Sequence, residues 1–138
     1  MLGDLLAEEK GLITGKRVLE PDIHGQPRIE ISAIGEGKIR GKIEYTEIWT
    51  YTTEQRLDGV QFGQGIGIMT IKEINEPVYI KGQGIGKTTE SGILRFVGTD
   101  FYSTSSNGKL SFLNELVGIF EYEPEKSGNY TAKVWEWK

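Results

Sequence analysis

The sequence contains the stretch Gly63-Gln64-Gly65-Ile66-Gly67 and, 19 positions later, repeats it as Gly82-Gln83-Gly84-Ile85-Gly86. Because side chains alternate between the two faces of a strand, glycines at every second position leave one face bare. A bare face allows a β-sheet to curl sharply. The two stretches therefore predict neighbouring strands that coil around a common interior.

The rest of the composition agrees with a β protein. The 138 residues include 33 β-branched residues and only 3 alanines, a bias typical of strands. Turn signals such as Asp58-Gly59, Ser91-Gly92 and Asn107-Gly108 recur about every 16–17 residues. We expect one domain over residues 1–138, a closed eight-stranded antiparallel up-and-down barrel. The expected strands cover residues 12–19, 28–34, 38–53, 60–73, 78–90, 93–105, 109–122 and 130–137.

The first ten residues suggest a different element. Leu2, Leu5 and Leu6 fall on one side of a helix and acidic residues on the other. The sequence therefore predicts a short N-terminal helix that docks on the sheet or frays.

Turn lengths decide which residues face the interior. A two-residue turn at residues 75–76 places both glycine stripes on one face, and a three-residue loop ending at Gly59 turns Trp49 and Tyr51 toward the same face. Trp49 then lies beside Gly67 and Tyr51 beside Gly65, so that an aromatic ring fills the space left by a glycine. Two-residue turns at residues 91–92 and 107–108 extend this face to the following set: Val97, Thr99, Phe101, Asn114, Leu116, Gly118 and Phe120. In the last strand the count favours Trp135 and Trp137 inside, with Val134 and Glu136 as the alternative.

Polar side chains on this face mark the candidate site. They are Glu47, Arg95, Thr99 and Asn114. Buried charges are costly unless paired, so Glu47 and Arg95 either form a structural salt bridge or orient a ligand. The walls of a ligand cavity would be Tyr45, Trp49, Tyr51, Phe101 and Phe120, which also fit plain core filling.

Composition removes several classes of function. The absence of cysteine and the single histidine, His24, exclude thiolate chemistry and multi-histidine metal sites, so no metal or cofactor is expected. A net charge of −4 argues against nucleic acid as a partner. Without a signal peptide or an apolar span, we expect a soluble, cytoplasmic protein with no membrane partner. The segment Gly82–Thr88 resembles a phosphate loop but lacks its first glycine, since Lys81 stands there.

The second half of the chain resembles a known family. The resemblance rests on residues 63–70, 82–86, Leu113-Asn114, 118–121 and Trp135-Glu136-Trp137. These residues are similar to those of uncharacterised microbial proteins grouped with the allene oxide cyclase barrel, a calycin-like fold also found in dirigent proteins. The resemblance implies a closed eight-stranded barrel and dimers or trimers, and it implies no assigned activity.

Three functional hypotheses follow. The first is binding of a small, largely apolar molecule in the barrel interior, because glycine opposite glycine leaves space there. The second is a cofactor-free isomerase or cyclase in which Glu47 is the acid–base group and Asn114 or Arg95 orients the substrate. The third is a structural or interaction barrel without a ligand.

The predicted outer face suggests self-association. A strip of apolar residues on neighbouring strands would face water in a monomer: Leu94, Phe96, Leu113, Val117 and Ile119. Because contiguous exposed apolar patches usually mark contact sites, we expect a homo-oligomer.

Overall fold

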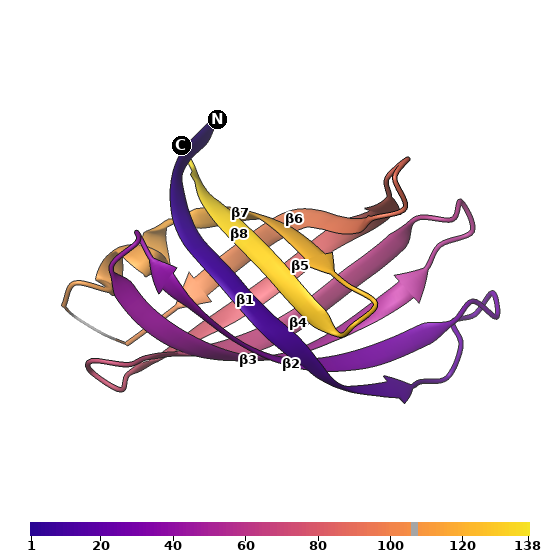
Figure 1. The fold of residues 1–138 in the computed structure, drawn as a ribbon, viewed down its shortest axis with the longest axis horizontal. Coiled ribbons are helices and arrows are strands. Elements are labelled where there is room, and N and C mark those ends of the chain that lie inside the picture. Colours follow the sequence, from indigo (N-terminus) through magenta and orange to yellow (C-terminus); the bar gives the residue numbers. More distant parts are fainter. Residues whose placement is uncertain (106–107) are drawn as a thin grey trace.

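The computed structural model describes residues 1–105 and 108–138, which form a closed antiparallel barrel in which each strand pairs with the next and β8 pairs with β1 (Figure 1). The described strands are β1 (Leu2–Val18), β2 (Arg28–Ile39), β3 (Ile43–Gln55), β4 (Gln61–Ile71), β5 (Pro77–Thr88), β6 (Leu94–Ser103), β7 (Val117–Pro124) and β8 (Asn129–Trp137). A 3₁₀ helix, η1 (Ser111–Glu115), lies between β6 and β7. The eight-stranded barrel expected from the glycine repeat is confirmed.

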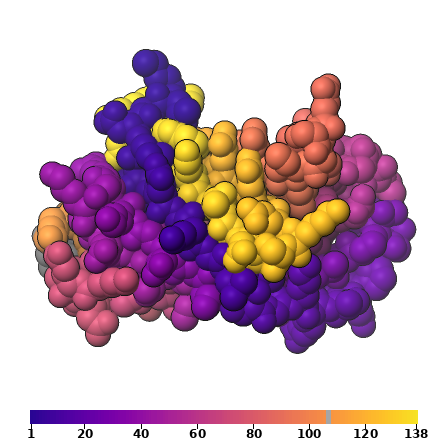
Figure 2. Space-filling model, in the orientation of Figure 1, coloured from indigo at the N-terminus to yellow at the C-terminus, as the bar shows by residue number. Residues whose placement is uncertain are grey.

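The prediction of an N-terminal helix is wrong. Residues 2–18 form β1, whose N-terminal part lies beside β8 and closes the barrel (Figures 1 and 2). The pairing of β1 with β8 shifts between Leu2 and Leu5 and again between Leu5 and Ala7. These irregularities break the alternation that identifies a strand, and they leave leucines at helix-like spacing. Barrel closure overrides that local pattern, because an unpaired edge strand would expose its backbone groups.

Both glycine stripes face the interior, as predicted. Gly63 pairs with Gly84 and Gly65 with Gly82. The observed register differs from the predicted one by four residues, because the turn covers residues 72–75 and is therefore centred two residues earlier than predicted. A shift by an even number leaves every side chain on its expected face.

Aromatic side chains cover the bare backbone. Trp49 pairs with Gly67 and Tyr51 with Gly65, as the three-residue loop ending at Gly59 predicts. A Cβ atom at Gly67 would lie 2.7 Å from Cε2 of Trp49, so the ring occupies the place of a side chain. The curled sheet and its aromatic lining therefore depend on the same glycines.

The face predicted for β6 is wrong. The hydrogen bond from Thr89 N–H to the Ile93 carbonyl (2.7 Å) closes a three-residue loop ending at Gly92, which has a φ of +87°. The odd residue in this loop reverses the strand, so Val97, Thr99 and Phe101 lie on the outer side. Phe101 is 52% exposed. The buried side chains of β6 are instead Phe96, Asp100 and Tyr102.

A second difference restores the predicted face of β7. The strand predicted over residues 109–122 begins at Val117, because η1 occupies residues 111–115. The pairing of Gly98 with Phe120 returns Gly118 and Phe120 to the interior. Phe120 was therefore placed correctly through two errors that cancel.

The last strand, β8, has the alternative of the two orientations considered. Tyr130, Val134 and Glu136 face inward, and Trp137 is exposed. The reason is again a three-residue loop, which ends at Gly128 and is closed by the hydrogen bond from Glu125 N–H to the Asn129 carbonyl (2.8 Å). The preference for Trp135 and Trp137 inside is wrong.

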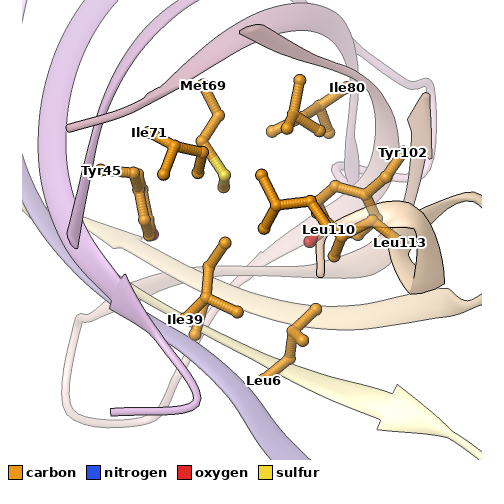
Figure 3. Packing of buried hydrophobic residues seen from close by; sticks show 11 residues of the cluster. Leu6, Ile39, Tyr45, Met69, Ile71, Ile80, Tyr102, Leu110 and Leu113 are labelled. Atoms are coloured by element: carbon orange, nitrogen blue, oxygen red, sulfur yellow. The ribbon is translucent and has the colours of Figure 1, made fainter. Parts of the chain in front are cut away.

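An apolar plug fills one end of the barrel, where η1 packs against the strands. Figure 3 shows side chains from separate strands and from the η1 segment converging there. The plug consists of Leu6, Ile39, Ile71, Val78, Leu110 and Leu113, which are at most 1% exposed. The predicted outer strip therefore does not exist, because Leu113 is in the plug and Phe96 faces the interior.

Candidate functional site

A cavity of about 100 Å³ lies inside the barrel beyond the plug. Along β3, Tyr45 contacts the plug, and Glu47, Trp49 and Tyr51 follow at successive inward positions toward the opposite end. The lining also includes aliphatic side chains and aromatic rings from other strands: Ala7, Ala33, Met69, Ile80, Phe96, Phe120, Tyr122, Tyr130, Ala132 and Val134. The space exists because glycines stand where side chains would otherwise fill an eight-stranded barrel.

Carboxyl groups from three strands line this cavity. They are Glu9 of β1, Glu47 of β3 and Asp100 of β6. Among the lining residues that the structure describes there is no lysine, arginine or histidine. The lining is therefore acidic and aromatic, without a protein cation to balance it.

Glu9 is the acceptor of a buried hydrogen-bond network. The hydroxyl of Tyr45 donates to its Oε1 (2.9 Å), and the hydroxyl of Tyr130 donates to its Oε2 (2.6 Å). The carboxyl group of Glu47 lies beside this network, close enough for the charge of Glu9 to raise its pKa. Glu9 therefore receives two phenol hydrogen bonds next to a second buried acid.

Burial favours the neutral form of these acids. Burial raises the pKa of Glu47 well above its ordinary value, and the neighbouring charge of Glu9 adds to that rise. The pKa of Glu9 is also raised by burial, while the hydrogen bonds from Tyr130 and Tyr45 oppose the rise. The two carboxyl groups therefore ionise less readily than exposed ones and titrate as a pair.

Asp100 is the unsatisfied member of the site. Its side chain is 7% exposed, and it has no hydrogen-bond or ion-pair partner among the described residues. Burial, and then the charge of Glu9, raise its pKa to about 8. Its Oδ1 lies 2.4 Å from the place that a Cβ of Gly82 would take, and Cη2 of Trp49 lies 3.4 Å from the same point. The carboxyl group and the indole ring therefore converge above Gly82.

Two tyrosines meet at the part of the cavity farther from the plug. The hydroxyls of Tyr51 and Tyr122 are 2.6 Å apart, and their rings are edge-on with centroids 5.7 Å apart. Phe96 packs against Tyr122 with a centroid distance of 6.1 Å. Paired phenols hold each other in place, so this wall is ordered before any ligand binds.

The structure brings together five of the eight predicted site residues. Tyr45, Glu47, Trp49, Tyr51 and Phe120 all line the cavity.

The other three predicted residues lie elsewhere. Arg95 forms an ion pair with Glu123 (2.7 Å) on the outer side and does not contact Glu47. Phe101 is exposed, as the loop at residues 89–93 dictates. Asn114 belongs to η1, where its amide accepts from the Thr104 N–H (2.8 Å) and donates to the Thr104 carbonyl (2.9 Å). Asn114 thus fixes η1 to the end of β6 and has no access to the cavity.

The cavity also contains residues that the sequence pattern does not indicate: Glu9, Asp100, Tyr122 and Tyr130. The pattern predicts a helix at Glu9, and the predicted register places Asp100 on the outer face of its strand. A three-residue loop at Gly92, by analogy with the loop at Gly59, would have placed Asp100 inside. The sequence contains that signal, since both loops end in glycine.

Comparisons with known proteins agree with the barrel. No protein-family model and no curated protein matches the sequence. The chain is similar to a protein with unknown function from Clostridium acetobutylicum ATCC 824, with a TM-score of 0.81, 11% identity and 98% of each chain covered. A beta-barrel like protein from Acinetobacter baumannii AYE has a TM-score of 0.83 and 13% identity, over 100% of this chain and 96% of that chain.

A third similar structure is a conserved protein of unknown function from Rhodopseudomonas palustris. Its TM-score is 0.79 at 13% identity, over 99% of this chain and 97% of that chain. At such identities the likeness shows the fold alone. The barrel part of the family resemblance is supported, and its link to allene oxide cyclase stays a hypothesis.

Two further observations concern the described residues. None of their helical segments has the length and apolar character needed to cross a membrane. In the same ranges, no three or more His, Cys, Asp or Glu side chains are grouped so that they could hold a metal ion.

Proposed function

We propose that the barrel binds a small, largely apolar molecule in its interior. The observation that carries the proposal is the cavity of about 100 Å³, which the side chains of the closed barrel leave unfilled. Its aromatic walls with a few converging polar groups are typical of ligand sites. Cavities of the order of 150 Å³ accept benzene, so the ligand, or the part of it that enters, is compact.

Filling the cavity tests this proposal. Ala33 is buried and lines the cavity, so Ala33→Leu places three more carbons in it. Thr46→Leu adds a similar side chain on the outer side of β3 and serves as the control. We expect a panel of compact organic molecules to include ligands that raise the melting temperature of the wild type and of Thr46→Leu. The same ligands should not stabilise Ala33→Leu, and equal binding by all three proteins would contradict an interior site.

A cofactor-free isomerase or cyclase of the allene oxide cyclase type is the second candidate. One observation favours it: Glu47 faces the cavity, and burial raises its pKa well above the ordinary value, as suits a general acid. Arg95 and Asn114 have no part in it, because neither lines the cavity. Native mass spectrometry of protein from its own host would identify a copurifying molecule. Incubation of that molecule with wild type and Glu47→Gln would show chemistry only if the wild type alone changes its isomeric composition.

The expected homo-oligomer remains a proposal and is now supported by a different face. A row of exposed apolar side chains crosses the outer side of neighbouring strands: Leu12, Ile34, Ile48, Ile68 and Tyr79. Ile48, at its centre, is 63% exposed. We expect a second copy of the chain to cover this row, in a dimer or trimer. Ile48→Glu should shift sedimentation to a 15.4 kDa species, and a wild type that already sediments as a monomer would contradict the proposal. We also propose, as a separate point, that the protein is located in the cytoplasm.

A further inference from the structure

The chemical class of the ligand can be inferred from the charges inside the barrel. Buried carboxylates in proteins are normally paired with a cation or satisfied by several hydrogen bonds. Glu9 accepts hydrogen bonds from Tyr45 and Tyr130, and Glu47 lies beside it. Asp100, equally buried, has neither kind of partner among the described residues. It is an acceptor directed into an open space.

The surroundings of Asp100 narrow the choice of its missing partner. Cη2, at the edge of the Trp49 ring, approaches the same point above Gly82 as the Asp100 Oδ1 atom, while the body of the ring covers Gly67. Proteins hold organic ammonium groups in cavities walled by aromatic rings, and a carboxylate there neutralises the charge. Tyr51, Phe120 and Tyr122 supply further aromatic surface to the same cavity.

A metal ion does not fit this arrangement. The three acids do not form a group that could coordinate a metal within the described residues. Aromatic walls provide no oxygen or nitrogen ligands to complete a coordination shell. The cation that fits must carry its own apolar body, which an alkylammonium group does.

We propose that the ligand of the barrel is a small organic cation, an amine or alkylammonium with a compact apolar body, held by the Asp100 carboxylate and the ring of Trp49. This inference rests on the proposed function and specifies the ligand class. The negative charge of Glu9 adds to the attraction, because no cation among the described lining residues competes for the ligand.

Binding of such a cation releases a proton from the site. The pKa of Asp100 is about 8 in the free protein, so the group is mostly protonated at neutral pH and must ionise to hold a cation. The titratable groups lining the cavity or buried beside Asp100 come from five strands: Glu9 of β1, Tyr45, Glu47 and Tyr51 of β3, Tyr102 of β6, Tyr122 of β7 and Tyr130 of β8. All of them are acids, so affinity for the cation rises as pH increases from 6 to 9.

A pair of isosteric probes separates the cation from its apolar body. tert-Butylammonium and tert-butanol have the same carbon skeleton and differ in the charged group. We expect the wild type to bind tert-butylammonium at least about tenfold more tightly than tert-butanol at pH 8. Titration calorimetry at pH 7, where Asp100 is mostly protonated, in buffers of different ionisation enthalpy should show about one proton released with the ammonium and none with the alcohol.

Two variants with the same change in net charge provide the controls. Asp100→Asn is isosteric and should weaken tert-butylammonium at least about tenfold while changing tert-butanol less than about threefold. Glu121→Gln removes an outer carboxylate that does not line the cavity, and it should leave both affinities unchanged. Circular dichroism of each variant checks that the barrel remains folded.

The outcomes separate the two proposals. If tert-butanol binds as tightly as tert-butylammonium and Asp100→Asn changes neither, the inference is overturned while interior binding stands. If the ammonium loses affinity equally in Asp100→Asn and Glu121→Gln, its attraction is to the net charge, and the inference is also overturned. If neither probe nor any molecule of the panel binds, the proposed function fails, and the inference fails with it.

Discussion

The two parts of the barrel interior treat a buried carboxyl group in opposite ways. At the plugged end, Glu136 is 6% exposed and forms an ion pair with Arg40 at 2.7 Å. Beyond the plug, Asp100 is 7% exposed and has no partner among the described residues. The plug is filled by apolar side chains, whereas the space around Asp100 is left open by glycines.

This difference assigns separate tasks to the two parts. Close packing and a satisfied charge stabilise the fold at the plug. An unpaired acid beside an empty volume lowers stability, and such groups persist where a ligand makes use of them. The comparison predicts that substitutions in the plug destabilise the protein and that substitution of Asp100 stabilises it.

The largest effect is expected from the packing of the plug. Leu113→Ala removes a completely buried side chain and should lower the free energy of unfolding by about 4 kcal/mol. Leu57→Ala, at a position 72% exposed, should change it by less than about 0.5 kcal/mol. Urea denaturation measures both. Equal values for the two variants would show that η1 does not seal the barrel.

The next effect concerns the satisfied carboxyl group. Arg40→Met keeps an apolar stem and leaves Glu136, within the part of the chain that the structure describes, with Lys138, whose Nζ is 3.8 Å away. Because removing one partner strands the other charge, stability should fall by about 3 kcal/mol. The double variant Arg40→Met/Glu136→Gln should recover most of this loss. If the double variant is not rescued, the loss of stability comes from the contact between the Arg40 guanidinium and the Phe112 ring, whose centroid is 4.0 Å away.

Substitution of the unsatisfied carboxyl group, Asp100, should raise the free energy of unfolding instead of lowering it. The pKa of Asp100 is raised to about 8 in the folded protein, so between pH 4 and pH 8 the unfolded chain holds fewer protons than the folded one. Wild-type stability therefore decreases as pH rises through this window. Asp100→Asn removes this contribution and should be more stable than wild type at pH 8 by on the order of 2 kcal/mol, with little difference at pH 4. Identical pH profiles of unfolding for the two proteins would contradict the unpaired state of Asp100.

The barrel could be predicted from the sequence because its signals are local. Alternating glycines, β-branched composition and regularly spaced turns together define coiled antiparallel strands. Which face of a strand points inward depends on whether the hairpin loop before it has an odd or an even number of residues. Loops ending at Gly25, Gly59, Gly92 and Gly128 share one geometry: each glycine has a positive φ and donates its N–H to the carbonyl three residues earlier.

The site was only partly predictable for the same reason. The three-residue loop was recognised at Gly59, which placed Glu47, Trp49 and Tyr51 correctly. The same loop was not recognised at Gly92. The two faces of β6 were therefore exchanged in the prediction, and Asp100 was expected on the outer side. Glu9 was missed for a different cause, since its strand becomes regular only through pairing with distant partners in β2 and β8.

The smallest expected effect distinguishes the outer charges from the inner ones. Arg95 was predicted to face Glu47, but its guanidinium pairs with Glu123 on the outer side, where both side chains are partly exposed. Solvent screens such a pair, so Arg95→Ala should lower stability by at most about 0.5 kcal/mol. It should also leave the affinity for any interior ligand unchanged, because Arg95 does not line the cavity. A loss of binding in Arg95→Ala that Glu123→Ala does not share would place Arg95 in the site after all, and the reversal of β6 would then be wrong in solution.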